Sequence, residues 1–125
     1  MRLLLDTQVY LWSLVDSPRL SAAARREIGD AEAVFVSAAS VWEMSIKVAL
    51  GKLDADPTVL VAGIAESGYR ELTVRVPHAA RVATLPPIHR DPFDRLLVAQ
   101  AIEEPLVLVT ADALLGRYSD LVQVL

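Results

Sequence analysis

The chain has 125 residues, the usual size of one compact domain, and we expect a single domain over residues 1–125. Apolar residues make up 54% of the chain, which excludes disorder, and charged residues interrupt every apolar run before the roughly 20 residues of a membrane helix. Asp6 breaks the apolar start, so we expect a cytoplasmic protein without a signal peptide. The net charge of −4 argues against holding nucleic acid by bulk attraction, but not against an enzyme that acts on it.

Apolar runs of strand length alternate with helical patterns along the chain. The predicted strands are residues 2–5, 33–36, 71–74, 106–109 and 121–125. The predicted helices are residues 7–15, 21–29, 37–51, 57–68, 77–85 and 92–104, with a short last one over 112–118. Because almost every strand is separated from the next by a helix, right-handed crossovers and a parallel sheet are the economical topology. We therefore predict a three-layer α/β/α fold with a five-stranded parallel sheet.

Four acidic residues are expected at the carboxyl ends of these strands, where sites in such sheets normally lie. Asp6 directly follows the first strand, and Asp112 follows the fourth strand in VTAD. Glu43 lies early in the helix after the second strand, and Asp94 lies in the first turn of the helix before the fourth. A helix that leads back into a parallel strand begins at the same sheet edge. All four side chains should therefore point to one place.

Each acid also has an ordinary structural explanation. Asp6 and Asp112 could cap the helices that follow them. Glu43 follows Ser40 at the spacing of a capping box, and Asp94 would complement a helix dipole. Taken singly, capping is the commoner role for all but Glu43, which has apolar neighbours. Four crowded carboxylates, however, repel one another and raise one another's pKa values, which is tolerable mainly where a divalent cation binds.

The expected cation is a hard one. The chain has no cysteine and only two histidines, His78 and His89, which cannot build a histidine-based zinc site alone. Carboxylate oxygens favour Mg²⁺ or Mn²⁺. Such a cation can activate water and neutralise charge on a phosphate, which predicts phosphodiester hydrolysis.

Three segments resemble the PIN-domain proteins of the VapC toxin group. They are LLLDT at the start, SAASVWEMSIKVALGKL in the middle, and RDPFDRLLVAQA followed by LVLVTAD. They cover essentially the whole chain in the family's order. The resemblance implies a metal-dependent endoribonuclease that acts on RNA as the toxin of a type II toxin–antitoxin pair. It also implies inhibition by a cognate VapB-like antitoxin and commonly a homodimer.

The resemblance also assigns the site residue by residue. The family's acidic positions fall on Asp6, Glu43, Asp94 and Asp112, which would be catalytic and would bind Mg²⁺ or Mn²⁺. Thr7 and Thr110 match hydroxyl residues beside the first and last acids, and Thr110 is counted with the catalytic set. We interpret Asp91 as a helix cap, and a supporting role beside the metal ligands stays open.

The other polar and aromatic residues carry weaker indications. We expect His89 to be an exposed loop residue without a role in the reaction, and His78 to stand at a helix start. Among the basic residues, we expect phosphate contacts only for Arg95 and Lys47. Two tryptophans, Trp12 and Trp42, are core residues by default, although an antitoxin segment could bind across the helices near them.

Two other functions fit a chain of this length. A phosphoacceptor receiver domain needs paired acids after the first strand, an aspartate after the third and a late lysine. Here Asp6 stands alone, the third strand leads into Arg75, and the last lysine is Lys52, so this reading fails. A catalytically silent PIN-like module that binds RNA or protein stays open, although the presence of all four acids gives it no support.

Overall fold

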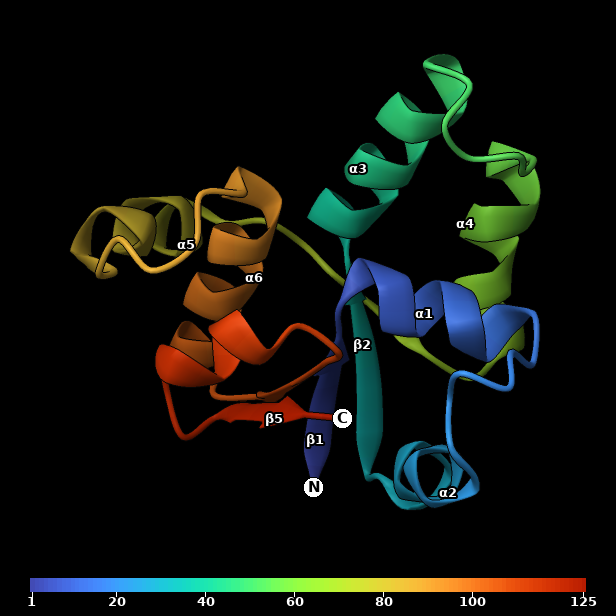
Figure 1. Cartoon of the computed structure of the whole chain (residues 1–125), viewed down its shortest axis with the longest axis horizontal. Helices are drawn as coiled ribbons and strands as arrows, with labels where there is room; N and C mark the ends of the chain where they lie inside the picture. The colour runs from blue at the N-terminus through green and yellow to red at the C-terminus, as the bar shows by residue number, and fades with distance from the viewer.

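The computed structural model describes all 125 residues and contains a five-stranded parallel sheet (Figure 1). The strands are β1 (Arg2–Leu5), β2 (Ala33–Ser37), β3 (Arg70–Leu72), β4 (Val107–Thr110) and β5 (Val122–Val124). Their order is β3-β2-β1-β4-β5, and every neighbouring pair is parallel. The predicted α/β class, the strand number and the parallel pairing are confirmed.

Six α-helices and two 3₁₀ turns connect the strands. The helices are α1 (Thr7–Leu14), α2 (Ala22–Asp30), α3 (Ala38–Ala49), α4 (Pro57–Glu66), α5 (Val76–Arg81) and α6 (Pro92–Glu103). The 3₁₀ turns are η1 (Val82–Thr84) and η2 (Ala113–Arg117). None of the helices has the length and apolar character that crossing a membrane requires.

Local chemistry sets where these elements begin and end. Gly51 adopts φ 72° just after α3, and the N–H of Lys52 bonds to the carbonyl of Lys47 at 2.8 Å. The helix therefore ends at Ala49, two residues before the predicted end. The third strand is shorter than the predicted 71–74 and begins at Arg70. It pairs only with β2, whose last residue, Ser37, is opposite Leu72, so no partner continues the ladder beyond that point.

Side chains of β1 alternate between two apolar layers, one on each face of the sheet. Leu3 and Leu5 belong to a core cluster with residues of α1, α2 and α4, whereas Leu4 belongs to a second cluster with residues of α6 and η2. In Figure 1, α1 and α4 lie to the right of the strands, and α5 and α6 lie to the left. The predicted three-layer arrangement is therefore present.

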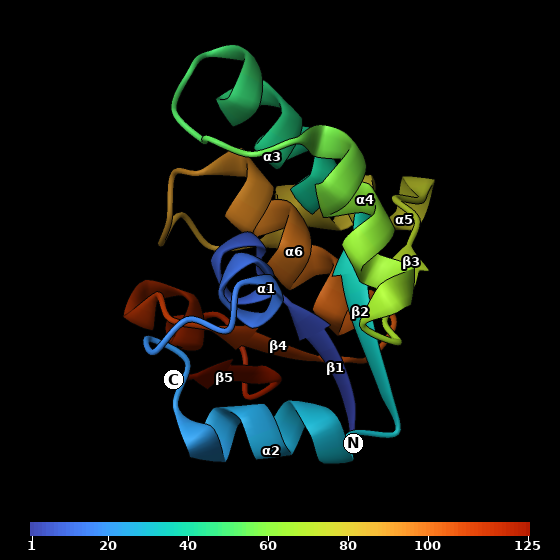
Figure 2. The same ribbon diagram turned by 90° about the vertical axis from the view of Figure 1, so that its right-hand side faces the viewer.

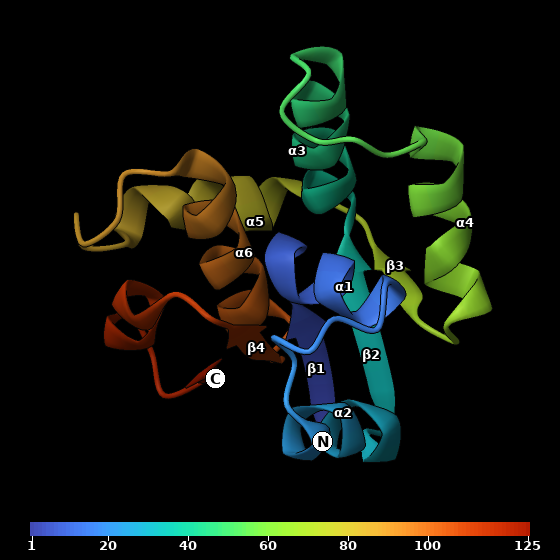
Figure 3. The ribbon, with the colours of Figure 1, turned by 45° about the vertical axis from the view of Figure 1, so that its right-hand side comes forward.

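The two ends of the sheet differ. Figure 2 shows α2 beside the amino-terminal end of β1, and Figure 3 shows α3 projecting from the carboxyl end of β2. The chain leaves β1 into α1 at Asp6 and enters α6 at Asp91, which places both helix N-termini near the carboxyl edge. The candidate acids are therefore delivered to one edge by the topology itself.

Helix α4 packs closely on α1 at Gly63, which leaves little room for a side chain. A β-carbon there would lie 2.7 Å from a methyl of Leu14 and 3.0 Å from the hydroxyl of Tyr10. That hydroxyl donates a 2.6 Å hydrogen bond to the carbonyl of Leu60. Gly63→Ala should therefore lower the free energy of unfolding, by about 1–3 kcal/mol, because overpacking outweighs the gain in helix propensity. Urea unfolding measures the change.

Gly29→Ala is the matched control, since Gly29 is also helical and has no atom within 4 Å of an added β-carbon. This variant should be neutral or more stable by about 0.5 kcal/mol. Equal stabilisation by both substitutions would contradict the close contact between α1 and α4.

Candidate metal centre at the carboxyl edge

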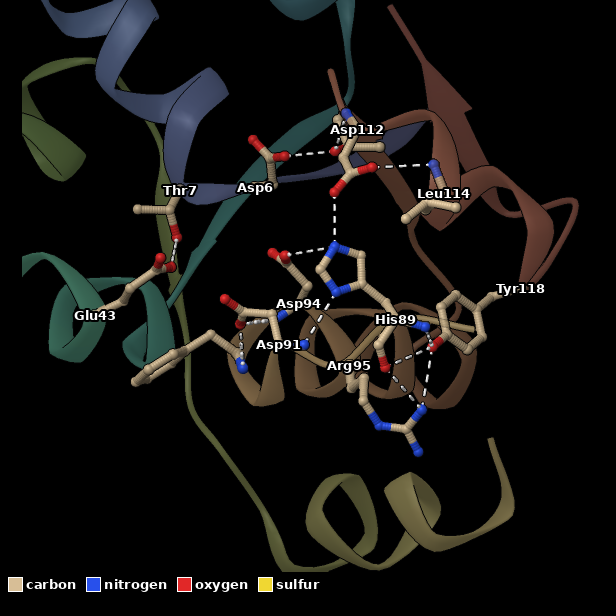
Figure 4. A network of polar contacts seen from close by, with 12 residues as sticks. Asp6, Thr7, Glu43, His89, Asp91, Asp94, Arg95, Asp112, Leu114 and Tyr118 are labelled. Atoms are coloured by element: carbon tan, nitrogen blue, oxygen red, sulfur yellow. Dashed lines mark hydrogen bonds and ion pairs between the residues drawn. The ribbon is translucent and has the colours of Figure 1, made fainter. Parts of the chain in front are cut away.

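The four predicted acids line one pocket of about 340 Å³ at the carboxyl edge of the sheet. Figure 4 shows them converging from β1, α3, α6 and the start of η2. The pocket is also lined by Thr7, Gln8, Leu11, Lys47, Asp91 and Ala111. The structure therefore brings together Asp6, Glu43, Asp94 and Asp112, as the sequence predicts.

A buried hydroxyl connects the first and last of these acids. Asp6 accepts the N–H of Val9 at 2.8 Å through one oxygen and the hydroxyl of Thr110 at 2.5 Å through the other. The oxygen of Thr110 in turn accepts the N–H of Asp112 at 3.0 Å. Thr110 is fully buried, so its role is to hold the two acids in a fixed relation.

Glu43 is held by side chains rather than by a capping box. The alternative of a capping box with Ser40 is wrong, because Ser37 is the N-cap of α3 and bonds to the N–H of Ala39 at 3.0 Å. One carboxylate oxygen of Glu43 accepts the hydroxyl of Thr7 at 2.6 Å. The other oxygen pairs with Lys47 at 3.0 Å. Thr7 therefore orients the second acid, not the first.

Asp94 differs from the other three acids because no hydrogen-bond donor reaches its carboxylate. The neighbouring Asp91 takes the capping role, accepting the N–H groups of Phe93 at 2.8 Å and Asp94 at 3.1 Å, as predicted. The ring of His89 is close to Asp94, with Nε2 3.6 Å from a carboxylate oxygen, beyond hydrogen-bond distance. Asp94 is thus free to accept a ligand in the pocket.

Burial and like charge disfavour the ionised forms of two acids. Burial, together with the nearby carboxylate of Asp91, raises the pKa of Asp94 to about 7, and His89 opposes this rise only in part. Burial also raises the pKa of Asp6, against the lowering effect of its bonds from Thr110 and Val9. The pocket is therefore short of positive charge in the absence of a cation.

His89 corrects an expectation from the sequence. Its side chain is only 19% exposed, and its Nε2 lies 2.8 Å from a carboxylate oxygen of Asp112. The prediction of an exposed loop residue is wrong, because the loop after Pro87 turns back and places the ring beside Asp112. The expected lack of a role in the reaction stays a prediction. The sequence feature that could have indicated this position is that His89 lies two residues before Asp91, the predicted helix cap. In the structure the N–H of Asp91 donates to Nδ1 of His89 at 3.0 Å.

The second histidine stands at a helix start, as expected. His78 is buried in the first turn of α5, where Nδ1 accepts the N–H of Arg75 at 2.9 Å. Its Nε2 lies 3.1 Å from a carboxylate oxygen of Glu104. It packs away from the pocket and supports the fold.

Arg95, for which the sequence predicts a phosphate contact, is bonded within the protein. Its guanidinium donates to the carbonyls of Pro86 at 3.0 Å and Val82 at 3.2 Å, and to the hydroxyl of Tyr118 at 3.1 Å. These bonds occupy the group within the protein, so it holds the loop before α6 in place. Lys47, in contrast, lines the pocket.

The two tryptophans have different settings. Trp12 is half-buried and packs against the larger core cluster, as the default reading predicts. Trp42 is 62% exposed and stacks edge to face on Phe93, with ring centroids 5.1 Å apart, so its placement in the core is wrong. It lies next to Glu43 in the chain, close to the candidate site.

The residues of the pocket fit a hard divalent cation. Five carboxylates line it against one ammonium group, that of Lys47. Ligand atoms of His89, Asp94 and Asp112 all lie within 4.8 Å of one another, and Asp6 and Glu43 complete the pocket outside that tight group. Oxygen donors of this kind suit Mg²⁺ and Mn²⁺.

Comparisons with known proteins agree with this fold and site. The PIN domain family model matches residues 3–121, and the chain therefore belongs to the PIN domain family. No curated protein matches the sequence.

Solved structures of toxin–antitoxin complexes have the same fold. VapBC from Salmonella typhimurium, solved bound to DNA, is 14% identical with a TM-score of 0.70, covering 100% of this chain and 97% of that chain. VapBC2 from Rickettsia felis, bound to a DNA fragment from their promoter, is 14% identical with a TM-score of 0.69, covering 98% of each chain. The PIN-domain resemblance of the sequence is confirmed.

The raised pKa of Asp94 predicts a pH-dependent effect of Asp94→Asn on the metal-free protein. The pKa of Asp94 is about 7 in the folded state, compared with roughly 3.9 for an aspartate in the unfolded chain. The protonated carboxyl therefore contributes its full stability below pH 4, and this contribution is lost as the pH rises to 7. Above pH 7 the free energy of unfolding of Asp94→Asn should therefore exceed that of the parent by about 1–3 kcal/mol. This difference should shrink as the pH falls towards 4. Urea unfolding in EDTA at one-unit steps measures it.

Asp54→Asn is the control for the change in net charge, because Asp54 is exposed in the loop between α3 and α4. Its effect should stay within about 0.5 kcal/mol at every pH. A gap for Asp94→Asn that does not depend on pH would contradict the buried, crowded carboxyl.

Proposed function

We propose that this chain is an endoribonuclease that uses Mg²⁺ or Mn²⁺ and forms the toxin half of a type II toxin–antitoxin pair. The observation that carries the proposal is Asp94: a largely buried acid that no hydrogen-bond donor reaches and that shares one pocket with four other acids. Membership of the PIN domain family and the motifs of the VapC group support it.

The proposed ligands are Asp6, Glu43, Asp94 and Asp112, all of which line the pocket. When bound, a divalent cation supplies Lewis acidity, which activates a water molecule and neutralises charge on the phosphate. The four acids offer the cation only oxygen atoms. Asp6, Glu43 and Asp112 are already held by hydrogen bonds, so they need little rearrangement to bind it. Asp94 gains most, because its charge has no donor in the protein.

Neighbouring side chains prepare the acids for this role. Thr110 holds Asp6, and Thr7 holds Glu43, each through a hydroxyl that donates to one carboxylate oxygen. Lys47 is the one cationic side chain that lines the pocket, and we assign it a contact with a substrate phosphate. RNA as the substrate rests on the resemblance to the VapC group.

The partner is proposed to be a VapB-like antitoxin, and the chain is proposed to form a homodimer. The likeness to solved VapBC complexes supports the antitoxin. An apolar groove of about 470 Å³ supports a protein interface, since it is lined by Trp42, Ile46, Ala79, Val82, Pro92, Phe93 and Leu96. Exposed apolar surface of this kind is stabilised when a partner covers it.

Cleavage of RNA by the purified chain, free of antitoxin, tests the activity. Single-stranded RNA should be cut in Mg²⁺ or Mn²⁺ and spared in EDTA. Asp94→Asn should reduce the rate by about 100-fold or more, because a metal ligand is lost. Gel analysis of a labelled RNA follows the reaction.

The matched control is Asp91→Asn, one turn away on the same helix. Asparagine caps a helix about as well as aspartate, so this variant should fold normally and keep most activity. Cleavage in EDTA, or full activity of Asp94→Asn, would refute the mechanism, and a correctly folded chain that binds RNA without cutting it would point to a silent binding module.

The oligomeric state has its own test. Light scattering of the chain without a partner should give the mass of a dimer across a tenfold range of concentration, because two copies can bury the apolar groove between them. A monodisperse monomer throughout that range would contradict the homodimer.

A further inference from the structure

The ring of His89 is held in one tautomer by the backbone of its own loop. Its Nδ1 lies 3.0 Å from the N–H of Asp91 and accepts that hydrogen. A backbone N–H can only donate, so Nδ1 carries no proton in this arrangement and the ring proton is on Nε2. That Nε2 lies 2.8 Å from Oδ2 of Asp112, at normal distance for a hydrogen bond. His89 therefore donates to Asp112.

Asp112 is less enclosed by packing than Asp94 and Glu43, so hydrogen bonds must fix the position of its carboxylate. Its side chain is 38% exposed, compared with 24% for Asp94 and 13% for Glu43. Its other oxygen accepts the N–H of Leu114 at 3.0 Å, which caps η2. With Oδ1 on the backbone and Oδ2 on His89, the carboxylate is fixed at both atoms.

His89 is itself held from the same segment that carries Asp112. Its N–H donates to the hydroxyl of Tyr118 at 2.7 Å, and Tyr118 follows η2 directly. Arg95 donates to that hydroxyl at 3.1 Å (Figure 4). It also donates to the carbonyl of Pro86 at 3.0 Å. The loop before α6 and the segment around η2 are therefore tied together, with the imidazole between them.

The same geometry argues against His89 as a metal ligand, although its Nε2 lies near Asp94 and Asp112. Ligation through Nε2 requires a bare nitrogen there and a proton on Nδ1. That proton would face the N–H of Asp91, and two donors would oppose each other. The hydrogen bond from the backbone thus favours donation by Nε2 over ligation.

We propose that His89 is a positioning residue whose Nε2–H fixes the carboxylate of Asp112 at the edge of the pocket, with Arg95 and Tyr118 holding the imidazole in place. The role rests on the proposed function, in which Asp112 is a metal ligand. It gives a purpose to a histidine that the acid set alone leaves unexplained.

Two substitutions separate the two ring nitrogens. His89→Gln places an amide N–H near the position of Nε2 and can still donate to Asp112. His89→Asn keeps an acceptor near Nδ1 for the N–H of Asp91 but cannot reach Asp112. Mn²⁺ affinity, measured by calorimetry without RNA, should fall about 10-fold in the asparagine variant and stay within about 3-fold of the parent in the glutamine variant. RNA cleavage should follow the same order.

Urea unfolding midpoints close to that of the parent should show that both variants fold. Nitrogen NMR of the metal-free parent at pH 8 should show the ring proton of His89 on Nε2. Saturating Mg²⁺ should leave that proton in place. Loss of the Nε2 proton on adding Mg²⁺, or equal Mn²⁺ affinity in both variants, would overturn the positioning role even if RNA is cleaved. Rescue by glutamine in a chain that binds Mn²⁺ but cuts no RNA would support His89 while refuting the nuclease.

Discussion

The arrangement of the whole carboxyl edge depends on crowding of negative charge. Five carboxylates line one pocket, and only one ammonium group lines it with them. Two unit charges 4 Å apart interact by about 4 kcal/mol at an effective dielectric constant of 20, so repulsion of this size must be opposed by something. The fold opposes it with neutral donors: the hydroxyls of Thr7 and Thr110, the ring of His89 and several backbone N–H groups. Asp94 is left for a cation.

Helix capping and site formation are not competing roles in this protein. Asp6 and Asp112 each use one oxygen to cap the element that follows and turn the other towards the neighbouring site residues. The cap anchors the side chain, and the anchor fixes where the second oxygen lies. On α6 the two roles are divided instead, because Asp91 caps the helix and leaves Asp94 free. A reading of each acid in isolation misses this sharing.

The sequence was sufficient for the features that depend on local pattern. Apolar runs predicted the strands, and the position of each acid after a strand or at a helix start predicted that the four meet. It was not sufficient for contacts made by long side chains between distant segments. Arg95 looks like a surface cation in sequence, and only the folded loop shows that carbonyls surround its guanidinium. His89 is misjudged for the same reason, since its partner Asp112 is distant in the chain.

Apolar packing directly beside the acids holds two layers of the site together. Glu43 on α3 follows Trp42, Asp94 on α6 follows Phe93, and the two rings stack with centroids 5.1 Å apart. An aromatic pair of this kind contributes about 0.5–1.5 kcal/mol beyond the area it buries. The stack therefore helps to hold α3 and α6 together against the repulsion between Glu43 and Asp94, which is one cause of the raised pKa of Asp94. A partner bound in the apolar groove would bury the exposed ring of Trp42 and strengthen its packing on Phe93. Binding in the groove would therefore also stabilise the arrangement of Glu43 and Asp94.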